Sequence, residues 1–102
     1  MKKNLGLVLG LGVALLAPVV AQAADAAAGE KKAAVCFACH GKDGKAAMKT
    51  YPNLAGQNRE YLVLALKAYR DGGRNDPVMV PMAKALTDTD IENIAAYFDR
   101  FD

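Results

Sequence analysis

The feature that most constrains this chain is the run Cys-Phe-Ala-Cys-His at positions 36–40. Residues three apart on a helix share one face, so Cys36 and Cys39 can both reach one edge of a planar group. The C-x-x-C-H spacing is the attachment motif of a covalently bound c-type haem. His40, the only histidine in the chain, can offer a ring nitrogen to the iron as the proximal ligand. The motif therefore predicts one haem c, attached through two thioether bonds.

Three other uses of two cysteines fit this sequence less well. A redox-active Cys-x-x-Cys pair belongs with a βαβ pattern, and the sequence contains no β-rich run. A structural zinc site needs four ligands, whereas Cys36, Cys39 and His40 supply only three. A disulfide between the two cysteines would give the adjacent histidine no role. Haem attachment is the interpretation that uses all three side chains.

The N-terminal residues have the organisation of a secretory signal peptide. Two lysines precede the apolar stretch Leu5–Val20, and Ala21–Ala23 forms an A-x-A cleavage site. An uncleaved membrane anchor is the alternative, but the apolar stretch is short for a membrane span and contains glycines and a proline. We therefore predict a cleaved signal peptide at residues 1–23 and a single mature domain at residues 24–102.

The predicted mature chain is small and almost neutral. A domain of this size is marginally stable unless a cross-link, metal or cofactor adds stability. A covalently bound haem would supply that stability. Loss of the signal peptide removes two lysines, so the remaining basic side chains balance the 11 acidic ones. This balance argues against a nucleic acid as the partner.

The residue pattern of the mature region predicts helices and no sheet, so the expected fold class is all-α. A first helix is expected over residues 26–39, capped by Asp25 and ended by Gly41. The segment 41–57 is rich in turn residues and is expected to be a loop. A second helix is expected over residues 58–71, where apolar residues recur at helical spacing.

The last helix is expected to begin at Thr87, where residues 87–90 resemble a capping box with Asp90 in the position usually held by Glu or Gln. Apolar residues then recur with the i, i+3, i+4, i+7 spacing of one buried helix face. These residues are Ile91, Ile94, Ala95 and Phe98. We interpret this face as core that packs on another helix.

The iron would need a second axial ligand opposite His40, and methionine is a common partner for histidine at haem iron. Met79 is the preferred candidate, because Pro77 and Pro81 are expected to hold it in an extended loop outside any helix. Met82 is the fallback and is expected to lie in the first turn of a short helix, packed on the haem ring. Met48 is within reach of the iron but lacks such a loop.

The ordered motifs resemble the class I cytochromes c, in the small monohaem periplasmic branch related to one half of the dihaem cytochromes c. The resemblance covers residues 25–102. Its motifs lie at residues 33–41, 51–57, 75–79, 86–88 and 91–98. It implies several helices wrapped around one covalently bound haem, with the N- and C-terminal helices crossing. It also implies that Met79 ligates the iron and that the carbonyl of Pro52 accepts a hydrogen bond from His40, which fixes the orientation of the histidine ring.

Two filled axial positions would leave the iron no site for a substrate, so we expect an electron carrier and not an enzyme. The resemblance implies a periplasmic protein. We also expect no stable membrane anchor after signal cleavage, and a monomer that exchanges electrons with periplasmic redox proteins. Two alternatives remain open. One is a dedicated haem subunit of a periplasmic oxidoreductase complex, and the other is a gas sensor or small peroxidase with an open sixth position.

Four basic residues lie in loops that are expected to rim the haem edge. They are Lys42, Lys45, Lys49 and Arg74. Such residues could steer acidic partners toward the haem. The same pattern fits an ordinary solvated surface equally well.

Overall fold

The computed structural model describes residues 23–102, so the predicted signal peptide lies outside the described residues except for its last position. The described range contains helices and no strand, and the predicted all-α class is confirmed. None of these helices has the length and hydropathy needed to cross a membrane. In chain order the elements are α1 (Ala26–Lys32), the 3-10 helix η1 (Ala33–Cys36), α2 (Phe37–His40), α3 (Arg59–Asp71), α4 (Met79–Lys84) and α5 (Asp88–Phe98).

The first predicted helix consists of three short pieces. α1 begins as expected at Asp25, whose carboxylate accepts hydrogen bonds from the N–H groups of Ala27 and Ala28 at 2.9 and 3.1 Å. A 3-10 turn lies between α1 and α2, so the expected helix is present without a break but is not α-helical throughout. The backbone angles of 3-10 and α turns are so similar that the residue pattern does not distinguish them. Gly41 ends α2 as predicted, with a φ of 80°.

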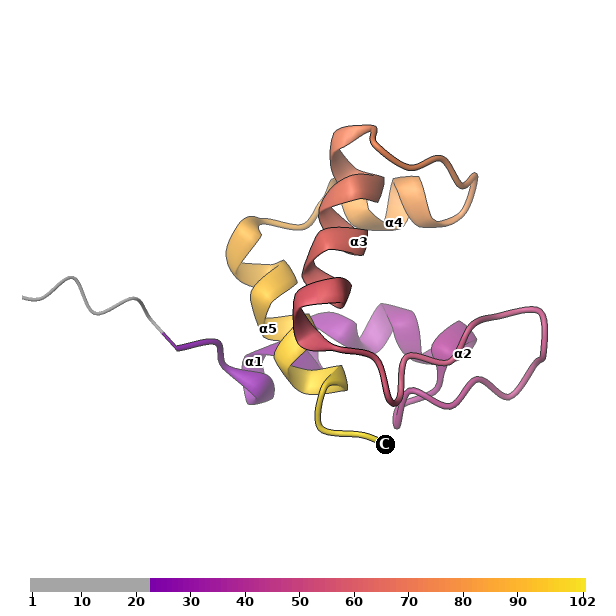
Figure 1. Cartoon of the computed structure of the whole chain (residues 1–102), viewed down its shortest axis with the longest axis vertical. Coiled ribbons are helices and arrows are strands. Elements are labelled where there is room, and N and C mark those ends of the chain that lie inside the picture. The colour runs from indigo at the N-terminus through magenta and orange to yellow at the C-terminus, as the bar shows by residue number, and fades with distance from the viewer. Residues whose placement is uncertain (1–22) are drawn as a thin grey trace, which may run out of the picture.

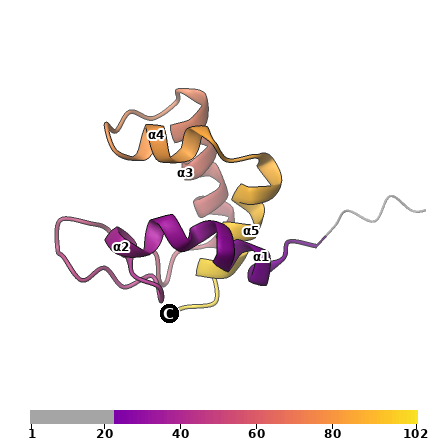
Figure 2. The same cartoon turned by 180° about the vertical axis from the view of Figure 1, so that it is seen from behind.

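The helices α1 and α5 cross in direct backbone contact. Gly29 is buried at the crossing, and a Cβ atom there would lie 1.9 Å from the carbonyl oxygen of Asn93. The side chain of Asn93 accepts a hydrogen bond from the Asp25 N–H at 2.8 Å. Figures 1 and 2 show the two helices against each other from opposite sides. The crossing implied by the family resemblance is present, and it requires a residue without a side chain at position 29.

Both features predicted for α5 are confirmed. The side chain of Thr87 accepts a hydrogen bond from the Asp90 N–H at 3.1 Å, and the Asp90 carboxylate accepts one from the Thr87 N–H at 3.0 Å, which completes the capping box. The predicted apolar face is buried throughout. It consists of Ile91, Ile94, Ala95 and Phe98.

The helical periodicity did not predict the burial of Tyr97. Its ring centroid lies 5.7 Å from that of Phe37 and 5.0 Å from that of Phe98. Its hydroxyl donates a hydrogen bond to the carbonyl of Lys42, 55 positions away in the sequence. Tyr97 therefore connects the end of α5 to the segment that follows His40.

The second predicted helix is confirmed as α3, which Figure 1 shows running across the other helices, with α4 beside its C-terminal part. It ends at Gly72, which has a left-handed φ of 93°. Arg70 connects α3 to the start of α5, because Nη2 lies 2.7 Å from a carboxylate oxygen of Asp88 and Nη1 donates to the carbonyl of Leu86 at 3.2 Å.

α4 contradicts the expected extended loop around Met79. Met79 is the first residue of α4, and Pro81 lies in the first turn. The Asp76 carboxylate accepts hydrogen bonds from the N–H groups of Val78 and Met79, each at 2.9 Å, as an N-cap residue does. Proline is tolerated there because the first N–H groups of a helix have no intrahelical acceptor. The proline-rich segment therefore starts a helix instead of preventing one.

Candidate functional site

A cavity of about 420 Å³ is lined by residues of η1, α2, α3, α4 and α5. Apolar side chains of α3 and α5 form much of its wall, and the loops at positions 50–57 and 74–76 add polar groups. All the site residues predicted from the sequence line this cavity. They are Cys36, Cys39, His40, Pro52, Met79 and the fallback Met82. The structure thus brings together residues that lie up to 46 positions apart in the chain.

His40 is buried at the cavity wall, with only 7% of its surface exposed. Its Nδ1 lies 2.8 Å from the carbonyl oxygen of Pro52. A carbonyl oxygen can only accept, so Nδ1 carries the proton that it donates to Pro52, and the neutral ring with this tautomer has its lone pair on Nε2, where it can bind a metal. The hydrogen bond implied by the resemblance is therefore present, while the role of His40 as an iron ligand stays a prediction.

A tight turn brings Pro52 to His40. The carbonyl of Gly44 accepts hydrogen bonds from the N–H groups of Leu54 and Ala55 at 2.7 and 3.0 Å. Gly44 is buried with a φ of 75°, and a Cβ atom there would lie 2.6 Å from the nitrogen of Ala55. The loop therefore folds back on itself at a point that only glycine fits.

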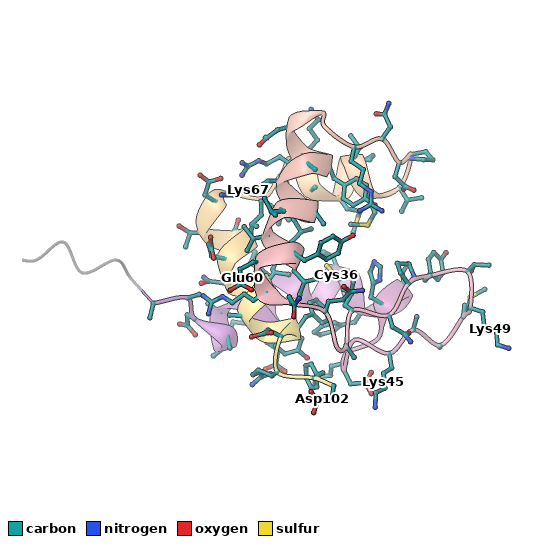
Figure 3. The ribbon with its side chains drawn as sticks, viewed as in Figure 1. Cys36, Lys45, Lys49, Glu60, Lys67 and Asp102 are labelled. Carbon is teal, nitrogen blue, oxygen red and sulfur yellow. The ribbon has the colours of Figure 1, made fainter. Side chains whose placement is uncertain are left out.

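Cys36 and Cys39 are partly buried at the cavity wall and are not joined by a disulfide. Figure 3 shows Cys36 on the side of the first helical segment that faces α3. Burial raises the pKa of the Cys36 thiol, and the negative charge of Cys39 raises it further. The protonated thiol is therefore favoured at neutral pH, which makes Cys36 a poor nucleophile for disulfide exchange.

The three candidate methionines occupy different environments. Met79 and Met82 both line the cavity from α4, three positions apart on one helix face. Met79 is half-buried, whereas Met82 is 38% exposed. Met48 is 60% exposed and lies outside the cavity lining. The geometry leaves two methionines in place to face a bound group, and the one with the capped backbone is Met79.

These residues fit a haem c. The cavity presents two thiols, an imidazole whose Nδ1 is hydrogen-bonded to Pro52, and a thioether from a separate helix, all within a largely apolar wall. The cytochrome c family profile matches residues 26–100. The chain belongs to the cytochrome c family. It accordingly carries one covalently attached haem c, with its iron, and has a haem-based electron-transfer role.

Two relatives and one solved structure place the chain within this family. It is 54% identical over 79 residues to cytochrome c-554(548) of Halomonas halodenitrificans. The matched region covers 74% of this chain and 95% of that protein. It is 45% identical to cytochrome c4 of Pseudomonas aeruginosa, over 95% of this chain and 47% of that protein. The crystal structure of reduced recombinant cytochrome c4 from Pseudomonas stutzeri matches with a TM-score of 0.73 and 42% identity, over 78% of this chain and 47% of that one.

The chain therefore spans about half the length of the cytochrome c4 relatives but nearly all of cytochrome c-554(548). These matches confirm the predicted cytochrome c fold. They also confirm the predicted relationship to the class I c-type cytochromes and to one half of the dihaem cytochromes c.

The four basic loop residues predicted to rim the haem edge are not equivalent. Arg74 lines the cavity, and the three lysines do not. Lys42 lies 3.6 Å from a carboxylate oxygen of Glu30. Lys45 and Lys49 are exposed, and Figure 3 shows both extending outward from the loop that follows α2.

Among the polar residues of the cavity wall that sequence reasoning did not assign to the site are Tyr61, Tyr69 and Asp76. Tyr61 and Tyr69 project from α3, eight positions apart and therefore on nearly the same face. Asp76 lines the wall below α4, and the hydrogen bonds from Met79 and Val78 lower the pKa of its carboxyl group. An Asp-Pro pair at the start of a helix is a recognisable cap signal, so the role of Asp76 could have been predicted.

Proposed function

We propose that this protein is a diffusible periplasmic electron carrier in which His40 and Met79 are the axial ligands of the haem iron. Cys36 and Cys39 hold the haem as thioethers. The observation that carries the proposal is the hydrogen bond between His40 Nδ1 and the Pro52 carbonyl, because it orients the imidazole and leaves Nε2 free inside the cavity. When bound, the haem supplies one-electron exchange between Fe(III) and Fe(II).

The protein contributes a fixed ligand set and not a reacting group. Pro52 keeps His40 in one tautomer, and Asp76 caps the turn that presents Met79. Because both axial positions are filled by side chains, no position is left for a substrate, and we infer that the protein is not itself an enzyme. The predicted signal peptide supports export to the periplasm, where redox proteins would act as donor and acceptor.

Carbon monoxide binding tests this proposal. The ferrous protein should bind carbon monoxide weakly and slowly at neutral pH, because the gas must first displace Met79. The Met79→Ala variant should bind it much faster, and Met82→Ala should behave like the unchanged protein. Fast, stoichiometric binding by the unchanged protein would contradict the proposal and favour a sensor or peroxidase.

Purification from the native host separates a diffusible carrier from a dedicated subunit. A carrier should elute as a small monomer and reduce more than one acceptor protein at low micromolar concentrations. Such encounters are weak and bury little surface. Co-elution with one oxidoreductase at fixed stoichiometry would instead identify a dedicated haem subunit.

A further inference from the structure

Arg74 is the one cationic side chain on the cavity wall among residues 23–102. Its backbone N–H donates to the carbonyl of Ala68 at 3.1 Å, which fixes the chain just beyond α3. Its guanidinium carbon lies 4.7 Å from the ring centroid of Tyr69. Its Nη1 lies 3.5 Å from the hydroxyl oxygen of Tyr61. Two tyrosines of α3 therefore hold the guanidinium against the cavity.

Within the described part of the chain, Arg74 has no carboxylate at ion-pair distance. Arg70, one turn earlier, is paired with Asp71 at 2.8 Å and Asp88 at 2.7 Å. Asp76 lines the same wall as Arg74, but its carboxylate accepts the N–H groups at the start of α4. Arg74 thus presents a planar set of donors, without a carboxylate partner among the described residues, to a largely apolar cavity.

The haem expected in this cavity carries carboxylate groups that could pair with the Arg74 guanidinium. A haem has two propionate carboxylates, and a carboxylate near apolar surface is costly unless it is paired and hydrogen-bonded. A guanidinium can donate two parallel hydrogen bonds to one carboxylate. Tyr61 and Tyr69 limit the rotation of the Arg74 side chain, so less conformational freedom is lost on binding.

We propose that Arg74 binds a haem propionate and that this ion pair raises the reduction potential of the iron. The inference rests on the proposed function, since it requires a haem in the cavity. A positive charge near the iron disfavours Fe(III) relative to Fe(II). The Arg74 side chain is exposed in this structure, so the ion pair resists salt only because the bound haem would cover the guanidinium. Tyr61 and Tyr69 are positioning residues that act through Arg74.

The test compares two variants of the holoprotein that lose the same single charge. Both side chains are exposed, but Arg74→Gln removes a cation from the cavity wall, whereas Lys49→Gln removes one from the outer end of a loop away from the cavity (Figure 3). The reduction potential is measured by spectroelectrochemistry at low and at high salt. Redox-difference infrared spectroscopy follows the carboxylate bands in the same samples.

Arg74→Gln should lower the potential at least about threefold more than Lys49→Gln does, and the difference should persist at high salt, where surface charges are screened. The carboxylate bands should shift in Arg74→Gln and stay in place in Lys49→Gln. Arg74→Lys should recover part of the potential. Equal, salt-sensitive drops in both glutamine variants, or unshifted carboxylate bands in Arg74→Gln, would overturn the assignment.

The methionine–iron charge-transfer band separates this inference from the proposed function. The band should be present in the unchanged protein and in Arg74→Gln alike. A missing band in the unchanged protein would contradict Met79 ligation and leave the infrared comparison to decide the role of Arg74. If Arg74→Gln folds poorly, the reduction potential of the Tyr61→Phe variant is measured instead. This variant should lower the potential in the same direction by a smaller amount, and an unchanged potential would count against the inference.

Discussion

The two sides of the haem cavity are held in different ways. On the His40 side, the ligand is buried and its segment is tied by contacts distant in sequence, including the bond from Tyr97 to the Lys42 carbonyl. On the Met79 side, α4 is short, its cap comes from Asp76 three positions away, and Met82 on the same face is 38% exposed. A cooperative core therefore supports the histidine, and mainly local contacts support the methionine. We expect the methionine side to open first.

The largest effect should come from removing the haem attachment itself, because both sides then lose the group they surround. The Cys36→Ala/Cys39→Ala double variant should be largely unfolded, since a chain of this size buries little surface without a staple. Far-UV circular dichroism and thermal melting measure the outcome. Native-like helicity with a cooperative transition in the absence of haem would show that the polypeptide core suffices.

The next largest effect should come from the α1–α5 crossing. Gly29→Val places a side chain where the first added atom would lie 1.9 Å from the Asn93 carbonyl oxygen. The helices must separate, at a cost of about 3 kcal/mol in the free energy of unfolding. Gly73→Ala is the control, because its nearest neighbour would be 3.7 Å away. Chemical denaturation should show a large loss for Gly29→Val and almost none for Gly73→Ala, and similar losses would argue against a tight crossing.

A smaller, pH-dependent effect is expected at the start of α5. The hydrogen bond from the Thr87 N–H lowers the pKa of Asp90, with a smaller contribution from Lys32. Because the folded-state pKa is lowered, the cap contributes fully above the unfolded pKa and is lost as the pH falls through the folded value. Asp90→Ala should cost about 1 kcal/mol at neutral pH. This deficit should shrink below about pH 4, and a deficit independent of pH would contradict the mechanism.

The smallest effect on global stability is expected from Asp76→Ala. This change removes the cap of α4, so the start of the helix should fray while α1 and α5 remain packed. The methionine–iron charge-transfer band should then be lost at a lower temperature than in the unchanged protein, with little change in the unfolding transition. Asp90→Ala should lower the unfolding transition and change the temperature at which the band is lost much less. If both variants moved both transitions equally, the two sides of the cavity would belong to one cooperative unit.

Local sequence signals predicted local structure well. The caps at Asp25 and Thr87 depend on residues two or three positions away, so their chemistry is visible in the sequence. The Cys-x-x-Cys-His motif is equally local, and the structure places all three of its reactive side chains at one cavity. The expectation for Met79 failed because Pro77 and Pro81 were interpreted as helix breakers, although a proline in the first turn is compatible with a helix.

Contacts between distant segments could not be predicted from the sequence alone. The approach of Gly29 to Asn93 and the bond from Tyr97 to Lys42 depend on how the helices cross. The sequence analysis grouped Arg74 with the lysines of the loop that follows α2, and only the fold shows that Arg74 lines the cavity. Propensity and periodicity describe one element at a time, whereas these contacts arise from the packing of several.

The most direct test of the account is the methionine–iron charge-transfer band of the ferric holoprotein in three forms. We predict that the unchanged protein and Met82→Ala show the band. Met79→Ala should lack it and have a lower reduction potential, because a weaker ligand replaces the thioether. Met82→Ala should lose less stability than the roughly 2 kcal/mol expected for a fully buried methionine. A band that survives in Met79→Ala and disappears in Met82→Ala would contradict the assignment and give the ligand role to Met82.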